Sequence, residues 1–473
     1  MYSSFLEKKK EKLKLLLSEL KKDYDYVSIL GTDIKSYRYM ANRSTSSIND
    51  GDDSERGFVI KLSNGRSFFE YSFDLLKDDV VAFAKEIKES LEVSPSLYKK
   101  EVKTLPVDDE KLVKDFRRES DFDKHLPTDI INFELKLKDE ILNKDKHVLN
   151  AMVLLSTLEV SKLFLSANKE LTQNYSWVNG IIVVYYNDEK MVMARSGAYG
   201  VTISEVLDKL PALVDEVIDK AKHLTKAKPI VPGVYDVITD PTITGLIAHE
   251  AFGHGVEMDQ FVKDRAVAKQ YINKYVASPI VSMRDGAGSV LSVASYFFDD
   301  DGILAHDTQI IKDGILVTGI CDLVSSRQLN TNPTGNGRRQ SYKNKAYTRM
   351  TNTFFEKGKD KLEDMIKSVK HGYMLFETDN GMEDPKNWAI QCVCQYGIEI
   401  IDGKLTDNYV SPVVMSGYVP DLLKSISMVS DDFKIIGSGQ CGKGYKEWVR
   451  VSDGGPALKA RVKLSWLKKL KNY

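Results

Sequence analysis

The sequence predicts an α+β fold in two parts, a smaller N-terminal domain (residues 1–228) and a larger, β-rich C-terminal domain (residues 229–473). Helical and strand patterns alternate through the first half, whereas short strands and turns dominate the second half. Between the halves, segment 226–233 contains two prolines and a glycine, which interrupt helices and strands. The chain is long enough for each part to bury a core of its own.

The N-terminal part is expected to combine amphipathic helices with strands. Asn64-Gly65, a favoured dipeptide of tight turns, lies between two apolar runs and predicts a hairpin. The expected helices, which carry apolar residues at helical spacing, are 3–22, 75–91, 130–143 and 203–224. The expected strands are 24–30, 58–62, 67–73, 152–155, 180–186 and 191–194. The polar segment 94–129 is expected to form loops or an exposed helix-turn region.

The C-terminal part is expected to hold short strands joined by turns. A strand at 234–238 leads into an apolar helix that begins near Thr242. Turn-rich strand segments are expected at 297–303 and 310–317, and a hairpin is expected at 398–407. This order places the helix at the start of the β-rich domain.

The stretch around which the chain is organised is His249-Glu-Ala-Phe-Gly-His254. Neutral imidazoles are good zinc ligands, and an adjacent carboxylate can take a proton from a metal-activated water. The pattern therefore predicts a hydrolytic metal site that uses His249, Glu250 and His254. The alternative is two unrelated histidines on a buried, partly helical segment.

The spacing of the two histidines is H-E-x-x-x-H, one residue longer than the familiar H-E-x-x-H of zinc proteases. In a regular α-helix, residues four apart differ by about 40° around the axis, but residues five apart differ by about 140°. A π-bulge, or a helix that unwinds after its first turn, would return His254 to the side of His249. Gly253 and Gly255 are expected to permit this distortion, since glycine adopts backbone angles that other residues avoid.

A catalytic zinc site needs a third protein ligand. The candidates are Glu257, Asp259, His306 and the four cysteines, Cys321, Cys392, Cys394 and Cys441. Cys441 lies in a stretch, 437–444, whose four glycines allow backbone to approach a site closely, and it is either a ligand or an ordinary loop residue. Cys392 and Cys394 share a face of a strand; filling the core is favoured over binding a metal there.

The segment Thr334-Gly-Asn-Gly-Arg-Arg339 resembles a phosphate-binding loop only superficially, because it lacks the Gly-Lys-Ser/Thr ending. Arg338 and Arg339 are expected to pair with carboxylates. Those carboxylates are either structural ones in the chain or the end of a bound substrate, which makes both arginines candidate substrate-binding residues.

The composition excludes several classes of protein. Lys and Arg number 67 and Asp and Glu number 68, so no excess of positive charge predicts direct binding of nucleic acid or acidic lipid. Apolar runs fall short of a membrane span, and the first residues lack the order of a signal peptide. Four cysteines make no disulfide framework, so a cytoplasmic protein is expected.

Together these motifs resemble those of the TldD/PmbA family of metallopeptidases, once called modulators of DNA gyrase. His249-Glu-Ala-Phe-Gly-His-Gly-Val-Glu257 is similar to the active-site motif of the family. Matches follow in the same order at 334–339, at Arg349-Met-Thr-Asn-Thr353 and at Cys441-Gly-Lys443. The TldD type keeps H-E-x-x-x-H and the PmbA (TldE) type lacks it, so this chain resembles the TldD type.

The resemblance implies that His249, His254 and Cys441 bind Zn²⁺ and that Glu250 acts in catalysis. It implies a zinc-dependent metallopeptidase that cleaves unfolded or flexible peptides with metal-activated water. The expected assembly is a homodimer or a heterodimer with a TldE/PmbA-type chain. Two alternatives stay open: a zinc hydrolase of a non-peptide amide, and a non-catalytic binding or adaptor protein with a vestigial site.

Overall fold

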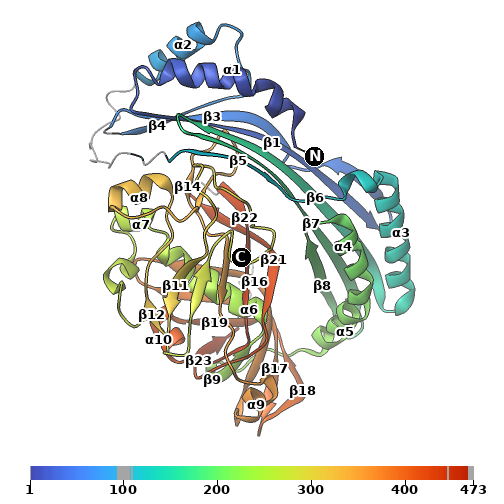
Figure 1. Ribbon diagram of the computed structural model, residues 1–473. Helices are drawn as coiled ribbons and strands as arrows, with labels where there is room; N and C mark the ends of the chain where they lie inside the picture. The colour runs from blue at the N-terminus through green and yellow to red at the C-terminus, as the bar shows by residue number, and fades with distance from the viewer. Residues whose placement is uncertain (1, 66, 93–106, 108–109, 445–446, 467–473) are drawn as a thin grey trace, which may run out of the picture.

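The computed structural model describes residues 2–65, 67–92, 107, 110–444 and 447–466. The first half of the chain forms a long, curved, eight-stranded sheet, and the second half lies against its concave face (Figure 1). The longest strands are β1 (Tyr26–Asn42), β6 (Val148–Ser166) and β7 (Lys169–Asn187). Strand β6 pairs antiparallel with β1 on one side and with β7 on the other.

The order of this sheet is β4-β3-β1-β6-β7-β5, with β2 paired to β1 and β8 paired to β7. The shorter strands are β2 (Ser46–Asp50), β3 (Glu55–Ser63), β4 (Phe68–Phe73), β5 (Leu112–Arg117) and β8 (Met191–Gly200). The predicted hairpin at Asn64-Gly65 is present as β3 and β4, and Gly65 has a φ of 81°, in the left-handed region that favours glycine.

The helices of the first half cover one face of the sheet: α1 (Ser4–Leu20), α2 (Val80–Glu92), α3 (Pro127–Lys144), α4 (Ile203–Lys209) and α5 (Leu213–Lys226). Side chains alternate across a strand, so the two faces of β6 bury different residues. Odd-numbered residues such as Val153 and Leu163 belong to the cores under the helices. Even-numbered Phe164 lies on the other face, in a cluster with Phe298 from the second half of the chain.

Several predicted elements differ from the observed ones. Strands β1, β6, β7 and β8 are far longer than predicted, because the sequence pattern reveals only their most apolar stretches. The expectation of loops or an exposed helix-turn region for 94–129 is wrong at Leu112–Arg117, which pairs in parallel with β7. Residues 93–106 and 108–109 lie outside the described residues. The single helix predicted at 203–224 is two helices, separated by a 3₁₀ turn around Pro211.

The second half builds a closed ring of strands beside a further sheet. Strand β16 pairs with both β9 and β17, which closes the path β16-β9-β23-β19-β17 into a barrel. These elements, with the flanking β18 and β20, are β9 (Gly233–Thr239), β16 (His371–Asp384), β17 (Ala389–Ile401), β18 (Lys404–Val410), β19 (Val413–Tyr418), β20 (Met428–Val429) and β23 (Leu458–Ser465). The boundary predicted at 228/229 falls between the end of α5 and the start of β9.

The further sheet has the order β12-β11-β10-β15-β22-β21. Its strands are β10 (Met283–Asp285), β11 (Thr308–Lys312), β12 (Ile315–Leu316), β15 (Asn352–Phe355), β21 (Lys434–Lys443) and β22 (Glu447–Gly455). A small ladder joins β13 (Gly337–Arg338) to β14 (Tyr347–Thr348), and the remaining helices are α6 (Pro241–Leu246), α7 (Asp259–Val262), α8 (Leu323–Leu329), α9 (Leu362–Lys367) and α10 (Val419–Lys424). The predicted α+β class with a β-rich C-terminal part is confirmed.

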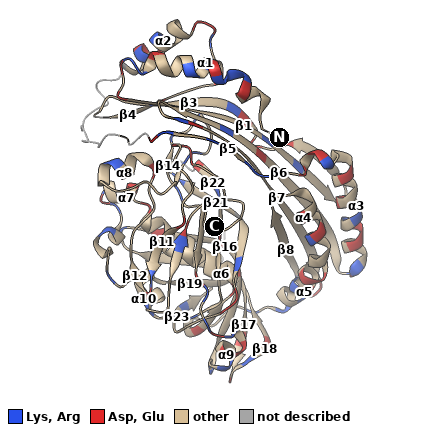
Figure 2. Cartoon of the chain, in the orientation of Figure 1, with Lys and Arg blue, Asp and Glu red and all other residues tan. Residues whose placement is uncertain are grey.

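Charged side chains of both signs are interspersed on the outer helices (Figure 2), as the near-zero net charge of −1 leads one to expect. Among the described residues, no helix is long and apolar enough to cross a membrane.

Candidate metal centre

The helix that carries both histidines begins immediately after strand β9. The side chain of Asp240 accepts a hydrogen bond from the backbone N–H of Ile243 at 2.8 Å, and Pro241 occupies the first turn. Ile243 and Ile247 are buried in the large core of the second half. The cap at Asp240 therefore fixes the start of the helix, and packing against the core fixes one of its faces.

The predicted distortion of this helix is present. Residues Ile247–Gly253 form a π-helix, and His254–Val256 continue as a 3₁₀ turn. The backbone N–H of His254 donates to the carbonyl of His249, five residues earlier. The two imidazole rings consequently lie on the same side of the helix, with their centroids 5.1 Å apart and their planes at 85°.

The reason given for glycine at position 253 is wrong, because Gly253 has ordinary right-handed angles, φ −60° and ψ −47°. What excludes a side chain there is space. A Cβ at this position would lie 2.2 Å from the sulfur of Met350 and 2.9 Å from the carbonyl oxygen of Ala248.

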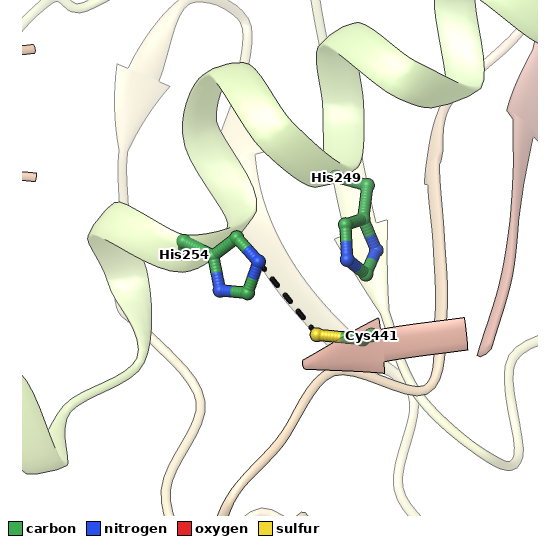
Figure 3. A group of neighbouring side chains, drawn as sticks. All are labelled: His249, His254 and Cys441. Atoms are coloured by element: carbon green, nitrogen blue, oxygen red, sulfur yellow. Dashed lines mark hydrogen bonds between the residues drawn. The ribbon is translucent and has the colours of Figure 1, made fainter. Parts of the chain in front are cut away.

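Cys441, from near the C-terminal end of the chain, lies beside the two histidines. It lies in strand β21, not in the loop that the glycines suggested, and pairs with Val449 of β22. Its Sγ is 3.6 Å from Nε2 of His254, and both rings lie beside the sulfur (Figure 3). One ligand atom from each of His249, His254 and Cys441 lies within 4.8 Å of the others.

The cluster is buried and electrostatically coupled. Cys441 is 2% exposed and His249 3% exposed. Burial opposes ionisation of the Cys441 thiol, but the adjacent His254 and His249 rings lower its pKa well below the usual value. Burial likewise opposes a charge on His254, yet Cys441 and Glu257 raise its pKa well above the usual value. The lowered pKa favours the thiolate, the form that binds metals.

Glu250 lies next to this cluster and remains accessible. Its Oε2 is 3.8 Å from Nε2 of His254, and 20% of its side chain is exposed. Gly381 of β16 packs against it, and a Cβ at that glycine would lie 2.7 Å from Cγ of Glu250. The missing side chain leaves room for the carboxylate beside the two rings.

The other candidate ligands are placed differently. Oε2 of Glu257 is 3.2 Å from Nδ1 of His254, on the opposite edge of the ring from the sulfur. Asp259 is engaged by Lys443, whose Nζ lies 2.7 Å from its Oδ1. The Cys321 thiol donates to the carbonyl of Asn332. Among the described residues, His249, His254 and Cys441 form the one group of at least three potential ligand atoms at metal-binding distances.

Three residues near the cluster were not identified from the sequence as parts of it. Lys443 belongs to the matched motif Cys441-Gly-Lys443, but the sequence indicated no role for it. Burial raises the pKa of Asp453 to about 6, a shift that His249 opposes. Burial also raises the pKa of Glu383 well above its usual value. No spacing rule marks either carboxylate, because β22 and the β16–β17 hairpin reach the site only in the folded chain.

Arg338 and Arg339 have partners within the chain. Arg339 donates to both carboxylate oxygens of Glu70, at 3.2 and 3.1 Å, across the boundary between the halves. Arg338 donates to the carbonyl oxygens of Met350 and Arg450, each at 2.7 Å. Arg339 therefore pairs with a structural carboxylate, whereas these contacts of Arg338 are to carbonyl oxygens. Substrate binding by the two arginines stays a prediction.

The donor set fits zinc. Two imidazoles and one thiolate are ligand types that zinc prefers, and three protein ligands leave a position for water or substrate. In addition, Nδ1 of His249 is buried without a hydrogen-bond partner in the described part of the chain. Buried nitrogens without a hydrogen-bond partner are uncommon in folded proteins, so this ring nitrogen remains able to bind a further group.

A family model described as the PmbA/TldA metallopeptidase C-terminal domain matches residues 232–462. That segment contains both histidines and Cys441.

Curated relatives match over part of their length. A metalloprotease of Methanocaldococcus jannaschii is 31% identical over 271 residues, which cover 57% of this chain and 59% of that protein. A metalloprotease of Synechocystis is 33% identical over 258 residues, 54% of this chain and 55% of that protein. A zinc metalloprotease TldD homolog of Saccharolobus solfataricus is 29% identical over 288 residues, 57% and 62% of the two chains. The chain thus spans less than two thirds of each relative.

Solved structures share the fold over almost the whole chain. A candidate modulator of DNA gyrase from Bacteroides thetaiotaomicron has a TM-score of 0.76 and 17% identity, covering 99% of this chain and 100% of that one. TldE from Thermococcus kodakarensis has a TM-score of 0.74 and 16% identity, covering 96% and 100%.

Proposed function

Because the chain belongs to the PmbA/TldD family through its C-terminal domain, residues 232–462, we propose that it is a zinc-dependent metallopeptidase of the TldD type. Its substrates are unfolded or flexible peptides. The observation that carries the proposal is the convergence of His249, His254 and Cys441 within 4.8 Å, with the carboxylate of Glu250 beside them. The name of the zinc metalloprotease relative in Saccharolobus solfataricus supports the choice of metal.

In this proposal His249, His254 and Cys441 hold the zinc ion. When bound, zinc supplies Lewis-acid activation of water and of the peptide carbonyl. The short separations between the three donor atoms mean that the chain needs little rearrangement to bind the ion. The lowered pKa of the Cys441 thiol favours the thiolate, which would bring a negative charge to the ion, whereas imidazoles bind metals in their neutral form.

Glu250 is the general base. Its carboxylate takes a proton from the attacking water and returns it to the nitrogen of the leaving amine. Both transfers require a carboxylate that reaches the substrate, and the partly exposed side chain of Glu250 meets that requirement. Glu257 does not, because its side chain is 2% exposed and its Oε2 is engaged by His254 and Lys443.

The proposed assembly is a homodimer or a heterodimer with a TldE/PmbA-type chain. The shared fold of this chain and TldE from Thermococcus kodakarensis supports a pairing between chains of one architecture. An extended peptide that pairs with a sheet edge would be recognised through its main chain, which tolerates varied sequences. Light scattering that finds a stable monomer with full activity would contradict this assembly.

The test combines metal analysis with an assay. Purified protein should contain zinc, and it should cleave an unstructured peptide but spare a tightly folded domain that contains the same sequence. Removal of zinc by a chelator should abolish cleavage, and added zinc should restore it. Product analysis on peptides and on simple non-peptide amides identifies the bond class. Zinc-loaded protein that cleaves only the non-peptide amides would overturn the peptidase assignment.

A further inference from the structure

A buried ion pair joins the two elements that carry the metal ligands, on the side away from the cluster. Glu257 follows His254 by three residues, and Lys443 follows Cys441 by two. Nζ of Lys443 lies 3.0 Å from Oε2 of Glu257. This ion pair therefore joins two segments that are 186 residues apart in the sequence, and it does so within three residues of a ligand on each segment.

Glu257 also orients a ligand. The same oxygen, Oε2, is 3.2 Å from Nδ1 of His254, while Nε2 of that ring faces the sulfur of Cys441 at 3.6 Å. A carboxylate at Nδ1 favours the tautomer with the proton on that nitrogen, which leaves Nε2 free to bind an ion. It also stops rotation of the ring.

Lys443 completes this arrangement with two further contacts. Its Nζ lies 2.7 Å from Oδ1 of Asp259 and donates to the carbonyl oxygen of Thr348 at 2.9 Å. The side chains of Lys443, Glu257 and Asp259 are 9%, 2% and 9% exposed. Breaking a buried ion pair leaves an uncompensated charge, which is strongly destabilising, so this network resists rearrangement.

We propose that Glu257 and Lys443 are positioning residues, which set metal affinity by fixing His254 against Cys441. The inference rests on the proposed metal-dependent function. In this role neither residue contacts the substrate or supplies a ligand atom to the ion. Glu257 lies on the Nδ1 edge of the ring, opposite the Nε2 atom that faces Cys441, which distinguishes a positioning role from that of a third ligand.

The experiment compares Glu257→Gln, Glu257→Ala and Lys443→Met with wild type. Matched controls come from a second, partly buried ion pair, between Lys220 of α5 and Glu377 of β16, in which the lysine likewise contacts backbone and side-chain acceptors. Lys220→Met and Glu377→Gln should lower the thermal midpoint of unfolding through the same loss of a buried pair. They should leave zinc affinity unchanged, because the contact of Glu377 with Asp240 at the start of the metal helix is made by its backbone N–H.

Two readouts are required: the zinc dissociation constant by competition titration, and the visible spectrum of the cobalt-substituted protein. Loss of carboxylates that orient metal-binding histidines typically weakens metal binding about 10–100-fold. We expect about 10-fold for Glu257→Gln, which keeps an acceptor at Nδ1, and about 100-fold for Glu257→Ala. The sulfur-to-cobalt band should persist in both, because Cys441 still binds.

The outcomes separate the possibilities. Wild-type zinc affinity in Glu257→Gln and Glu257→Ala, with only the stability loss of the control pair, would overturn the positioning role. If Glu257→Gln changed the coordination number seen in the cobalt spectrum, Glu257 would be a ligand and the inference would also fail. Should Lys443→Met not fold, the two Glu257 variants decide alone. Wild-type protein that binds neither metal would instead defeat the proposed function.

Discussion

The backbone N–H of His254 donates a hydrogen bond to the carbonyl of His249, five residues earlier. In a regular α-helix that bond would join residues four apart, and the two rings would point in different directions. The wide turn absorbs the additional residue of H-E-x-x-x-H and brings the rings to one side of the helix. The site therefore depends on a local distortion, and this dependence can be tested.

Gly253→Ala should strain that turn. The new methyl group would lie 2.2 Å from the Met350 sulfur and 2.9 Å from the Ala248 carbonyl oxygen, so side chains and backbone must shift. Overpacking of this kind costs about 1–3 kcal/mol of unfolding free energy, and we expect weaker zinc binding as well. Chemical denaturation and zinc titration measure both. Gly417→Ala is the control, because a Cβ there meets nothing within 4 Å.

Glu250→Gln should retain zinc and lose peptide hydrolysis. The amide keeps the shape of the side chain but cannot accept the proton, and a general base contributes about 10²–10⁴-fold to the rate. Elemental analysis and the turnover number of the same preparation check the two halves of the prediction. Turnover near that of wild type would remove Glu250 from the mechanism.

Cys441→Ser should lose most of its zinc, because two histidines alone make an incomplete site. X-ray absorption of the wild-type protein should find one Zn–S distance of about 2.3 Å and Zn–N distances of about 2.0–2.1 Å. Cys392→Ser serves as the control, since that thiol is also buried but is not part of the ligand group. A serine variant that holds zinc as tightly as wild type, while Glu257→Gln loses it, would contradict the assignment of Cys441.

Glu134 should make stability depend on pH. It lies buried in helix α3, and burial raises its pKa to about 9, with the backbone of Leu155 opposing the shift. The folded state therefore holds this proton more tightly than the unfolded state, whose pKa is 4.5. The resulting stability is fully present below pH 4.5 and is lost as pH rises towards about 9.

Glu134→Gln should remove this dependence. Its unfolding free energy should exceed that of wild type at pH 8 to 9 and change less between pH 5 and 9, as urea titrations at several pH values can measure. Glu140→Gln, on an exposed position of the same helix, should retain the wild-type slope. A wild-type slope in Glu134→Gln would show that this carboxyl group is not protonated in the folded chain.

The sequence by itself determined the class of fold and the local chemistry. Hydrophobic periodicity located the helices, and Asn64-Gly65 located a hairpin, because these signals depend on near neighbours in the chain. The five-residue spacing of His249 and His254 was enough to predict a wide turn, since helix geometry leaves few other ways for both to meet one ion. Strand lengths were underestimated, because half-polar stretches become strand only through pairing with β1, β6 and β7.

Only the tertiary structure brought distant residues together. The meeting of Cys441 with the histidines requires β21 to pack beside the helix, and no local pattern encodes that approach. The same packing places Glu257 against Nδ1 of His254, where it also pairs with Lys443. The sequence alone had left Glu257 among the possible ligands. It also turned Arg339 towards Glu70, across the boundary between the halves. Spacing within one helix is fixed by backbone geometry, whereas contacts between elements are fixed by the burial and pairing of the whole core.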